Sequence, residues 1–376
     1  MKVALVHEFL NQYGGAERVL EAIHELYPDS TVFTALYDPD KMPQQMRNWD
    51  IRPFKLPRIP LMKAYTFFYP ILFEGLDLTG YDLVISSSSS FAKGVLTGPG
   101  TVHISYIHTP PRFLYHYPAE TNRRNLWLIG PLLAPLDTYL RMWDFAAAQR
   151  PSFLIANSKE VAGRIKKFYC REATVIYPPV ALPKPNNQTT KSPDNYFLVV
   201  SRLVGYKAID IAINAANKLK IPLKIVGRGK EEERLKRLAG PTVEFLGFLS
   251  DDRLSAVYQN CQALIFPTDE DFGITPVEAM SFGKPVIAFA KGGALETVLA
   301  GKTGEFFAEQ SAVSLVKVLR RFDPSKYDPK FIRAHANKFS KERFQKEFSN
   351  FVNSKISAKG GSASGGKYQN AKRHRI

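Results

Sequence analysis

The segment ALIFPTDEDFGITPVEAMSFGKPVIAFA, residues 263–290, contains two short apolar runs separated by a polar loop and a helical pattern. We expect strands at 263–267 and 285–290, and between them a helix at 276–282 that begins at Pro276, since proline is favoured at the first helical position. A strand, a helix and a strand in this order form one unit of a parallel sheet. Residues 268–275 then lie at the carboxyl edge of that sheet, where ligands bind in such folds.

The same alternation continues in both directions along the chain. In the first half, strands are expected at 2–7, 30–36, 81–88, 102–108 and 153–158, with helices at 16–26 and 159–169. In the second half, strands at 195–203, 223–227 and 243–247 alternate with helices at 207–219, 230–239 and 251–260. The pattern predicts an α/β protein with two doubly wound, Rossmann-like domains that face each other across a cleft.

Composition shifts mark the boundaries. Residues 181–195 are rich in Pro, Asn and Thr and are expected to link an N-terminal domain at 1–180 to a C-terminal domain at 196–352. The Gly/Ser-rich, basic tail at 357–376 is expected to be disordered and resembles a linker or tag.

The chain is strongly basic: 51 Lys and Arg against 35 Asp and Glu give a net charge of +16 over 376 residues. Such a charge suits nucleic acid, lipid headgroups or phosphorylated small molecules, and does not choose among them. No apolar run is long enough to span a membrane. The two cysteines, Cys170 and Cys261, lie far apart and outside any Cys/His pattern, which argues against a zinc site or a disulfide and favours a cytoplasmic protein.

Two acids frame the loop quoted above. Taken alone, Glu270 would be a solvated loop residue, and Glu278, expected in the first helical turn, would complement the helix dipole. Their surroundings favour a ligand site, because Arg202 ends the strand at 195–203 and Lys207 begins the next helix, over the same edge. Two cations there can hold a diphosphate, and Gly273 lets backbone approach a ligand closely.

The motifs SRLVGYK (201–207), LGFLSDDRL (246–254) and PTDEDFGITPVEAMSFGKPVIAFAKGGALETV (267–298) resemble those of the retaining glycosyltransferases of family 4, which have the GT-B fold. The resemblance covers residues 1 to about 352. It implies that Glu270 contacts the donor sugar, that Glu278 binds the ribose hydroxyls and that Arg202 and Lys207 hold the diphosphate. It also assigns donor contacts to the backbone of Gly273, Ile274, Thr275, Gly247 and Phe248. Ala208 departs from the family, where glycine is common.

In the first domain, Gly14 and Gly15 follow the first strand and form either a structural turn or, by the resemblance, a loop that meets the ligand. His108 comes just after a strand and looks like the family's active-site histidine, with Arg112 nearby; the alternative is a structural histidine. His7, also expected at a strand end, is a weaker candidate. The sequence Asp38-Pro39-Asp40 has the form of a metal-binding motif but is expected to be a turn, and no metal is predicted.

Residues 51–73 interleave basic and aromatic side chains. They form either a surface for an anionic membrane, which would suit a lipid-linked acceptor and a peripheral location on the inner face of the membrane, or an ordinary core helix with a solvated edge.

We therefore expect a retaining hexosyltransferase that uses a nucleotide-sugar and acts on a glycan or lipid-linked acceptor in polysaccharide or glycolipid synthesis. The resemblance favours mannosyl transfer from GDP-mannose; a UDP-hexose donor is the alternative, followed by a GT-B epimerase or phosphorylase. Arg202 and Lys207 would stabilise the leaving diphosphate without a metal. A nucleic-acid-binding protein is disfavoured, because no recognition motif accompanies the charge.

Overall fold

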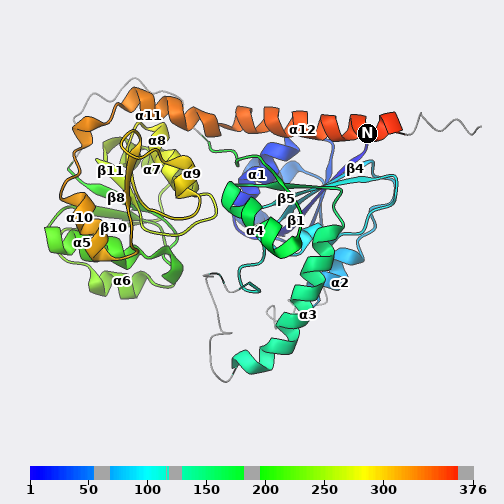
Figure 1. The fold of residues 1–376 in the computed structure, drawn as a ribbon, viewed down its shortest axis with the longest axis horizontal. Helices are drawn as coiled ribbons and strands as arrows, with labels where there is room; N and C mark the ends of the chain where they lie inside the picture. The colour runs from blue at the N-terminus through cyan, green and yellow to red at the C-terminus, as the bar shows by residue number, and fades with distance from the viewer. Residues whose placement is uncertain (55–67, 116, 118–128, 182–194, 363–376) are drawn as a thin grey trace, which may run out of the picture.

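The computed structural model describes residues 1–54, 68–115, 117, 129–181 and 195–362; side chains are described except at 129–132 and 358–362. The predicted linker, apart from its end residues, and residues 55–67 of the basic-aromatic segment lie outside these ranges. In the described part of the chain, two parallel sheets with flanking helices lie side by side (Figure 1). The predicted α/β fold class is confirmed.

The first sheet has seven strands in the order β3-β2-β1-β4-β5-β6-β7. Their bounds are β1 Val3–Leu10, β2 Thr31–Tyr37, β3 Ile51–Pro53, β4 Leu83–Ser88, β5 Val102–Ile107, β6 Phe153–Ala156 and β7 Thr174–Val175. All neighbouring strands are parallel. The second sheet has six parallel strands in the order β10-β9-β8-β11-β12-β13. They are β8 Phe197–Val200, β9 Leu223–Val226, β10 Val243–Gly247, β11 Ala263–Phe266, β12 Val286–Phe289 and β13 Gly304–Phe307.

Both sheets share the doubly wound order, in which the chain first builds outward to one side and then returns to build to the other. The order reverses between β1 and β4 in the first sheet and between β8 and β11 in the second. At such a reversal the connecting helices leave on opposite faces, so a crevice opens beyond the carboxyl ends of the two central strands. Most of the predicted ligand residues lie on the loops or helix starts that follow β1, β8, β11 and β5, the neighbour of β4, whereas Gly247 and Phe248 lie at the end of the edge strand β10.

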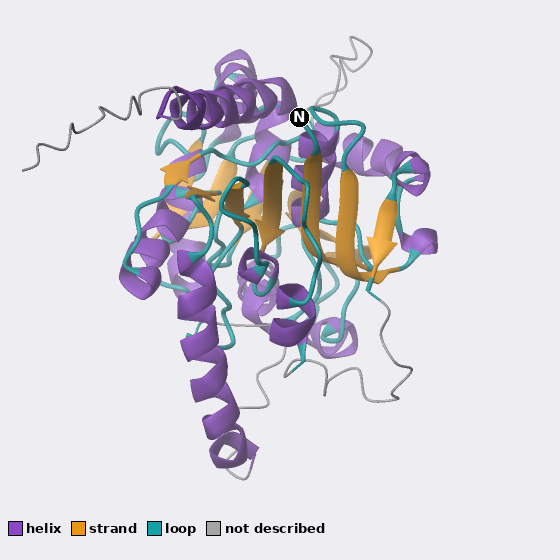
Figure 2. Ribbon diagram, turned by 90° about the vertical axis from the view of Figure 1, so that its right-hand side faces the viewer, coloured by secondary structure: helices purple, strands orange, loops and turns teal. Residues whose placement is uncertain are grey.

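Helices cover both faces of the sheets (Figure 2). In the first domain they are α1 Gly15–His24, α2 Tyr69–Glu74, α3 Ile129–Gln149 and α4 Lys159–Tyr169. In the second they are α5 Ile209–Leu219, α6 Glu232–Leu238, α7 Asp251–Asn260, α8 Ile274–Ser281, α9 Ala294–Thr297, α10 Ala312–Leu319 and α11 Pro329–Ala336. Local capping sets the bounds of α4. The Ser158 hydroxyl accepts a hydrogen bond from the Val161 N–H at its start, and Cys170 ends the helix in a left-handed conformation.

Three sequence predictions of element bounds were wrong at the site. Strand β1 continues to Leu10, so His7 lies inside the strand and not at its end. Lys207 lies in a short 3-10 turn, and α5 begins only at Ile209. Helix α8 begins at Ile274, two residues before Pro276, which places Glu278 in the second turn. Proline is tolerated at the third helical position because the first amides of a helix have no partner within it.

The last helix, α12 (Lys341–Ser362), leaves the second domain and packs on the first (Figure 1). Phe344, Phe348 and Val352 are fully buried in the core that also contains Leu5, Leu20 and Ile85. The predicted second domain ends at residue 352 and the predicted disordered tail covers 357–376; in the structure the helix instead runs through residue 362. The chain therefore crosses twice between the domains.

Helix α3 projects from the first domain in both views (Figures 1 and 2). In the part of the chain that the structure describes, no helix is both long enough and apolar enough to cross a membrane. In the basic-aromatic segment 51–73, Tyr69 and Phe73 belong to the hydrophobic core, as the core-helix interpretation expected, whereas Phe68 and Ile71 are exposed.

Candidate active site

A cavity of about 590 Å³ lies between the two domains, over the carboxyl edges of both sheets. Ten of the predicted site residues line it: Gly14, Gly15, His108, Arg112, Arg202, Lys207, Glu270, Gly273, Ile274 and Thr275. They are up to 261 positions apart in sequence. They come together because the strand order of each sheet reverses at its centre, and the loops at the carboxyl ends of both sheets face the cavity. Gly247, Phe248 and Glu278 do not line this cavity.

The charged floor of the cavity belongs to the second domain. Lys207 Nζ and Glu270 Oε1 form an ion pair, and both side chains are largely buried. Arg202 lies beside them and donates from Nη2 to the Tyr206 hydroxyl at 3.0 Å. Two cations and one carboxylate therefore lie at the carboxyl edge of the second sheet, after β8 and β11. This arrangement suits a ligand that carries both phosphate and hydroxyl groups.

Helix α8 presents its N-terminus to the same cavity. Gly273 caps it with a left-handed backbone, φ 83°, which a side chain would strain. The amides of Ile274 and Thr275 begin the helix, where the dipole and free N–H groups favour an anion. Gly15 of the first domain comes so close that a Cβ there would lie 2.5 Å from Ile274 Cδ1. A side chain at Gly15 would therefore require the end of the Ile274 side chain to shift.

Glu278 lies in a neighbouring cavity of about 190 Å³ between α1, α7 and α8. Its Oε1 is 2.8 Å from Nη1 of Arg18, which belongs to the first domain. The Tyr258 hydroxyl donates to its Oε2 at 3.0 Å, and burial followed by the nearby Glu278 charge raises the pKa of Tyr258 well above its usual value. The two acids of the quoted motif therefore serve two adjoining cavities.

Gly247 and Phe248 lie at the end of β10, next to α7. Gly247 adopts a left-handed backbone, φ 66°, and its carbonyl accepts from the Gly227 N–H at 2.8 Å. Phe248 is 74% exposed. The structure therefore leaves the aromatic ring free to cover a ligand that reaches this end of the sheet, but it does not place these two residues on either cavity.

His108 follows β5 on the first-domain side of the cavity. Its Nε2 is 2.8 Å from the Ser87 hydroxyl, and its carbonyl accepts from the Asn157 side chain. Burial, and to a lesser degree the nearby His7, lowers the pKa of His108 to about 3. The ring is therefore neutral at physiological pH. It can donate or accept a hydrogen bond with a ligand but cannot form an ion pair with it.

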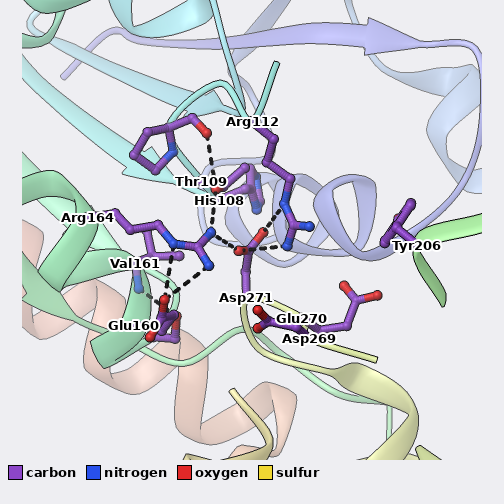
Figure 3. A network of polar contacts seen from close by, with 12 residues as sticks. His108, Thr109, Arg112, Glu160, Val161, Arg164, Tyr206, Asp269, Glu270 and Asp271 are labelled. Carbon is purple, nitrogen blue, oxygen red and sulfur yellow. Dashed lines mark hydrogen bonds and ion pairs between the residues drawn. The ribbon is translucent and has the colours of Figure 1, made fainter. Parts of the chain in front are cut away.

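Two arginines of the first domain converge on Asp271 of the second (Figure 3). Arg112 contacts it with Nη2 at 2.8 Å and Nε at 3.2 Å, and Arg164 on α4 contacts Oδ1 with Nη1. Arg164 also pairs with Glu160 at 3.1 Å. Because all three members of the Asp271 cluster are at most 15% exposed, these contacts hold the Glu270 loop against the first domain.

Sequence reasoning missed Asp271, Arg164 and Arg18, as well as the buried polar residues behind His108. Asp271 directly follows Glu270, so its position was visible, but its partners lie more than 100 positions away and no local pattern connects them. Glu296 is a further case: its carboxylate accepts from the backbone N–H groups of Lys159 and Glu160 at the start of α4, across the domain boundary.

The Asp38-Pro39-Asp40 motif forms a turn, as expected: the Asp38 carboxylate accepts from the Asp40 N–H and pairs with Lys41 at 2.7 Å. Within the described ranges, no three His, Cys, Asp or Glu side chains are grouped as metal ligands. Cys170 and Cys261 are both free.

Two family models match adjacent parts of the chain: Glycosyltransferase Family 4 at residues 13–183 and Glycosyl transferases group 1 at residues 183–336. O-antigen chain mannosyltransferase C of Escherichia coli is 24% identical over 347 residues, which are 84% of this chain and 83% of that protein. Alpha-1,3/1,6-mannosyltransferase ALG2 of Dictyostelium discoideum is 51% identical over only 63 residues, 16% and 15% of the two chains.

Among solved structures, that of Anabaena Alr3699/HepE in complex with UDP has a TM-score of 0.68 at 20% identity and covers 94% of this chain and 100% of its own. The likeness extends over both domains and so concerns the whole two-domain fold. It shows the GT-B fold, and the two adjacent family matches, which together span residues 13–336, show that the chain belongs to the family 4 glycosyltransferases.

Proposed function

We propose that this glycosyltransferase is a retaining enzyme that moves a mannosyl group from GDP-mannose to a glycan or lipid-linked acceptor in cell-surface polysaccharide or glycolipid synthesis. The observation that carries the proposal is the cavity where Arg202, Lys207 and Glu270 of the second domain face His108 of the first. The similarity to an O-antigen chain mannosyltransferase and to ALG2 supports mannose as the sugar. A UDP-hexose is the second candidate, favoured by the UDP in the structural neighbour.

In the proposed mechanism, the diphosphate takes Lys207 away from Glu270 and binds it together with Arg202 and the first amides of α8. Glu270 is then free to accept hydrogen bonds from the donor sugar. The two cations and the helix N-terminus stabilise the negative charge that develops on the leaving diphosphate, so the step needs no metal. Closure of the domains around the donor would exclude water and favour transfer over hydrolysis.

Glu278 would bind the ribose hydroxyls. In the ligand-free protein its carboxylate is held by Arg18 and Tyr258, and a ribose would replace Arg18 as the hydrogen-bond partner. Among the described residues that line the cavity, the carboxylates of Glu17, Glu270 and Asp271 are paired with cationic or imidazole side chains, and that of Glu8 accepts from backbone N–H groups, so none is an evident nucleophile. We therefore propose that the acceptor hydroxyl attacks on the face that the diphosphate leaves, with a phosphate oxygen accepting its proton.

A lipid-linked acceptor and a peripheral location at the inner face of the membrane are part of the proposal. They are supported by apolar side chains exposed on the first domain, among them Ile71 at 56% and Met142 at 69% exposure. Exposed apolar side chains with basic residues nearby favour binding of a protein to the headgroup region of an anionic membrane.

The test is transfer from ¹³C-labelled GDP-mannose and UDP-hexoses to a lipid extract, with the anomeric configuration of the product read by NMR. The proposal expects an α-linked mannosyl product from the α-linked donor. It expects Glu270→Gln to lower the rate severely, while Asp269→Asn, on the same loop and paired with the exposed Lys291, keeps it. An inverted product, or equal rates in both variants, would contradict the proposal. Release of an epimer from donor alone would instead indicate an epimerase.

A further inference from the structure

A line of four polar side chains runs through the first domain to the cavity: Glu17, His7, Ser87 and His108. Glu17 Oε1 is 3.4 Å from His7 Nε2, His7 Nδ1 is 3.1 Å from Ser87 Oγ, and Ser87 Oγ is 2.8 Å from His108 Nε2. The first three residues are at most 4% exposed. Each of their side chains has a partner within this line.

Counting protons fixes the direction of these hydrogen bonds. A carboxylate only accepts, a hydroxyl has one proton to donate, and a neutral imidazole donates from one nitrogen and accepts at the other. With Glu17 ionised, Nε2 of His7 donates to it, and Nδ1 of a neutral His7 accepts the proton of Ser87. Ser87 then has no proton left for His108, so it accepts from His108 Nε2–H.

We propose that Glu17, His7 and Ser87 are positioning residues that hold His108 as the neutral Nε2–H tautomer, so that its Nδ1 accepts a hydrogen bond from a hydroxyl of the sugar or acceptor. The identity of that hydroxyl rests on the proposed function, whereas the tautomer does not. In the part of the chain that the structure describes, no group bonds to Nδ1 of His108, which lines the cavity. The low pKa of His108 agrees with a ring that stays neutral.

Glu17 is itself held in place. Its second oxygen, Oε2, accepts from the Gly14 N–H at 2.8 Å, in the glycine turn that also lines the cavity. The line of hydrogen bonds thus connects the Gly14–Gly15 turn, which meets the second domain, to His108 on the loop after β5. The opposite direction requires one more proton on the Glu17–His7 pair, carried either by a doubly protonated His7 or by the Glu17 carboxyl beside a His7 protonated at Nδ1. In both cases His7 would donate to Ser87 and leave His108 protonated at Nδ1.

The test is the tautomer of His108 in the ligand-free, full-length protein, read from long-range ¹H–¹⁵N correlations of ¹⁵N-histidine. The chain has seven histidines, and His108→Gln assigns the signal. We expect a protonated Nε2 and an unprotonated Nδ1 in the wild type, and a mixture of tautomers in Ser87→Ala. Ser86→Ala is the matched control, because Ser86 is equally buried but bonds to His103 and Ser105.

Glu17→Gln is the second variant, for use if Ser87→Ala does not fold as judged by circular dichroism. Its amide can donate as well as accept, so the direction is no longer fixed and a mixture of tautomers is again expected. A wild-type His108 protonated at Nδ1, or an unchanged tautomer in these variants, would overturn the inference.

Kinetics separate this inference from the proposed function. Ser87→Ala should lower kcat roughly two- to tenfold, the effect of one net hydrogen bond. The affinity for the nucleotide diphosphate alone should stay unchanged, because the residues proposed to bind it lie on the second domain. Ser87→Thr, which keeps the hydroxyl, should restore kcat. If the tautomer is as expected but no sugar is transferred, the proposed function fails and the positioning role stands. If transfer is observed but the tautomer does not respond, the positioning role fails.

Discussion

The Asp271 cluster offers a stability test in which a substitution in one domain is read in the other. Asp271→Asn removes the charge that faces Arg112 and Arg164 but keeps the shape and one acceptor oxygen. Breaking a well-buried ion pair costs about 3–5 kcal/mol. The loss here is smaller, because Arg164 keeps Glu160 at 3.1 Å and Arg112 lines the cavity, which is open to solvent. We expect a loss of about 2 kcal/mol in the contact between the domains.

The assay is urea unfolding followed by tryptophan fluorescence. All three tryptophans, Trp49, Trp127 and Trp143, belong to the first domain, so the signal reports that domain alone. With a denaturant dependence of about 2 kcal/mol per M, the midpoint should fall by about 1 M. Asp269→Asn is the matched control, since its partner Lys291 lies in the same domain and is 63% exposed; it should shift the midpoint by less than about 0.3 M.

An unchanged first-domain midpoint in Asp271→Asn would refute the reasoning, because it would mean that the cluster does not couple the domains. A double-mutant cycle with Arg164→Gln sharpens the test. The two substitutions should be non-additive by at least about 0.5 kcal/mol if the residues contact each other in solution.

Three further predictions concern the fold and the site. Phe344→Ala should lower the free energy of unfolding by about 3–5 kcal/mol, because its ring is fully buried under the first sheet. Phe331→Ala is the control and should change this free energy little, because Phe331 on α11 is 43% exposed. Equal effects of the two substitutions in a denaturant titration would contradict the docking of α12. Ser158→Ala should cost about 1 kcal/mol through the lost cap of α4, and a loss below about 0.3 kcal/mol in the same titration would argue against that cap. The pKa of His108 is about 3 in the folded protein and about 6.5 in an unfolded chain, so between these pH values the unfolded chain binds one more proton. The free energy of unfolding should therefore fall as the pH decreases through this range, by up to about 1.4 kcal/mol per pH unit. His108→Gln should remove this contribution to the pH dependence.

The fold was largely predictable because its signals are local. Strand-like apolar runs and helical patterns alternate along the chain, and α4 and α7 begin and end where the sequence predicted. The start of α8 was misplaced because Gly273 caps the helix through its left-handed backbone and not through a capping side chain. The end of β1 was misplaced because the charged Glu8, which follows the predicted strand 2–7, looks like a loop residue.

The polar residues in β1 are accommodated by contacts that the sequence does not reveal. The Glu8 carboxylate accepts from four consecutive backbone N–H groups, Ser89 to Ala92, and from the Ser88 hydroxyl, which lie 80 to 84 positions away. The return of α12 to the first domain was missed for the same reason, since the core residues that it contacts, such as Leu5 and Ile85, lie more than 250 positions away. The site residues at strand ends were found from local motifs, whereas their partners across the cleft depend on the arrangement of the two domains.

The measurement that tests the central claim most directly is calorimetric titration of the purified protein with GDP, UDP, ADP and their sugar conjugates. The account predicts that one nucleotide series binds and that Lys207→Ala abolishes most of this affinity. Lys291→Ala, which removes an exposed lysine from the same edge of the sheet, should bind as the wild type does. Glu278→Ala should weaken the nucleotide itself, and Glu270→Gln only the sugar conjugate. Absence of binding in every series, or equal binding by the two lysine variants, would contradict a nucleotide-sugar site in this cavity.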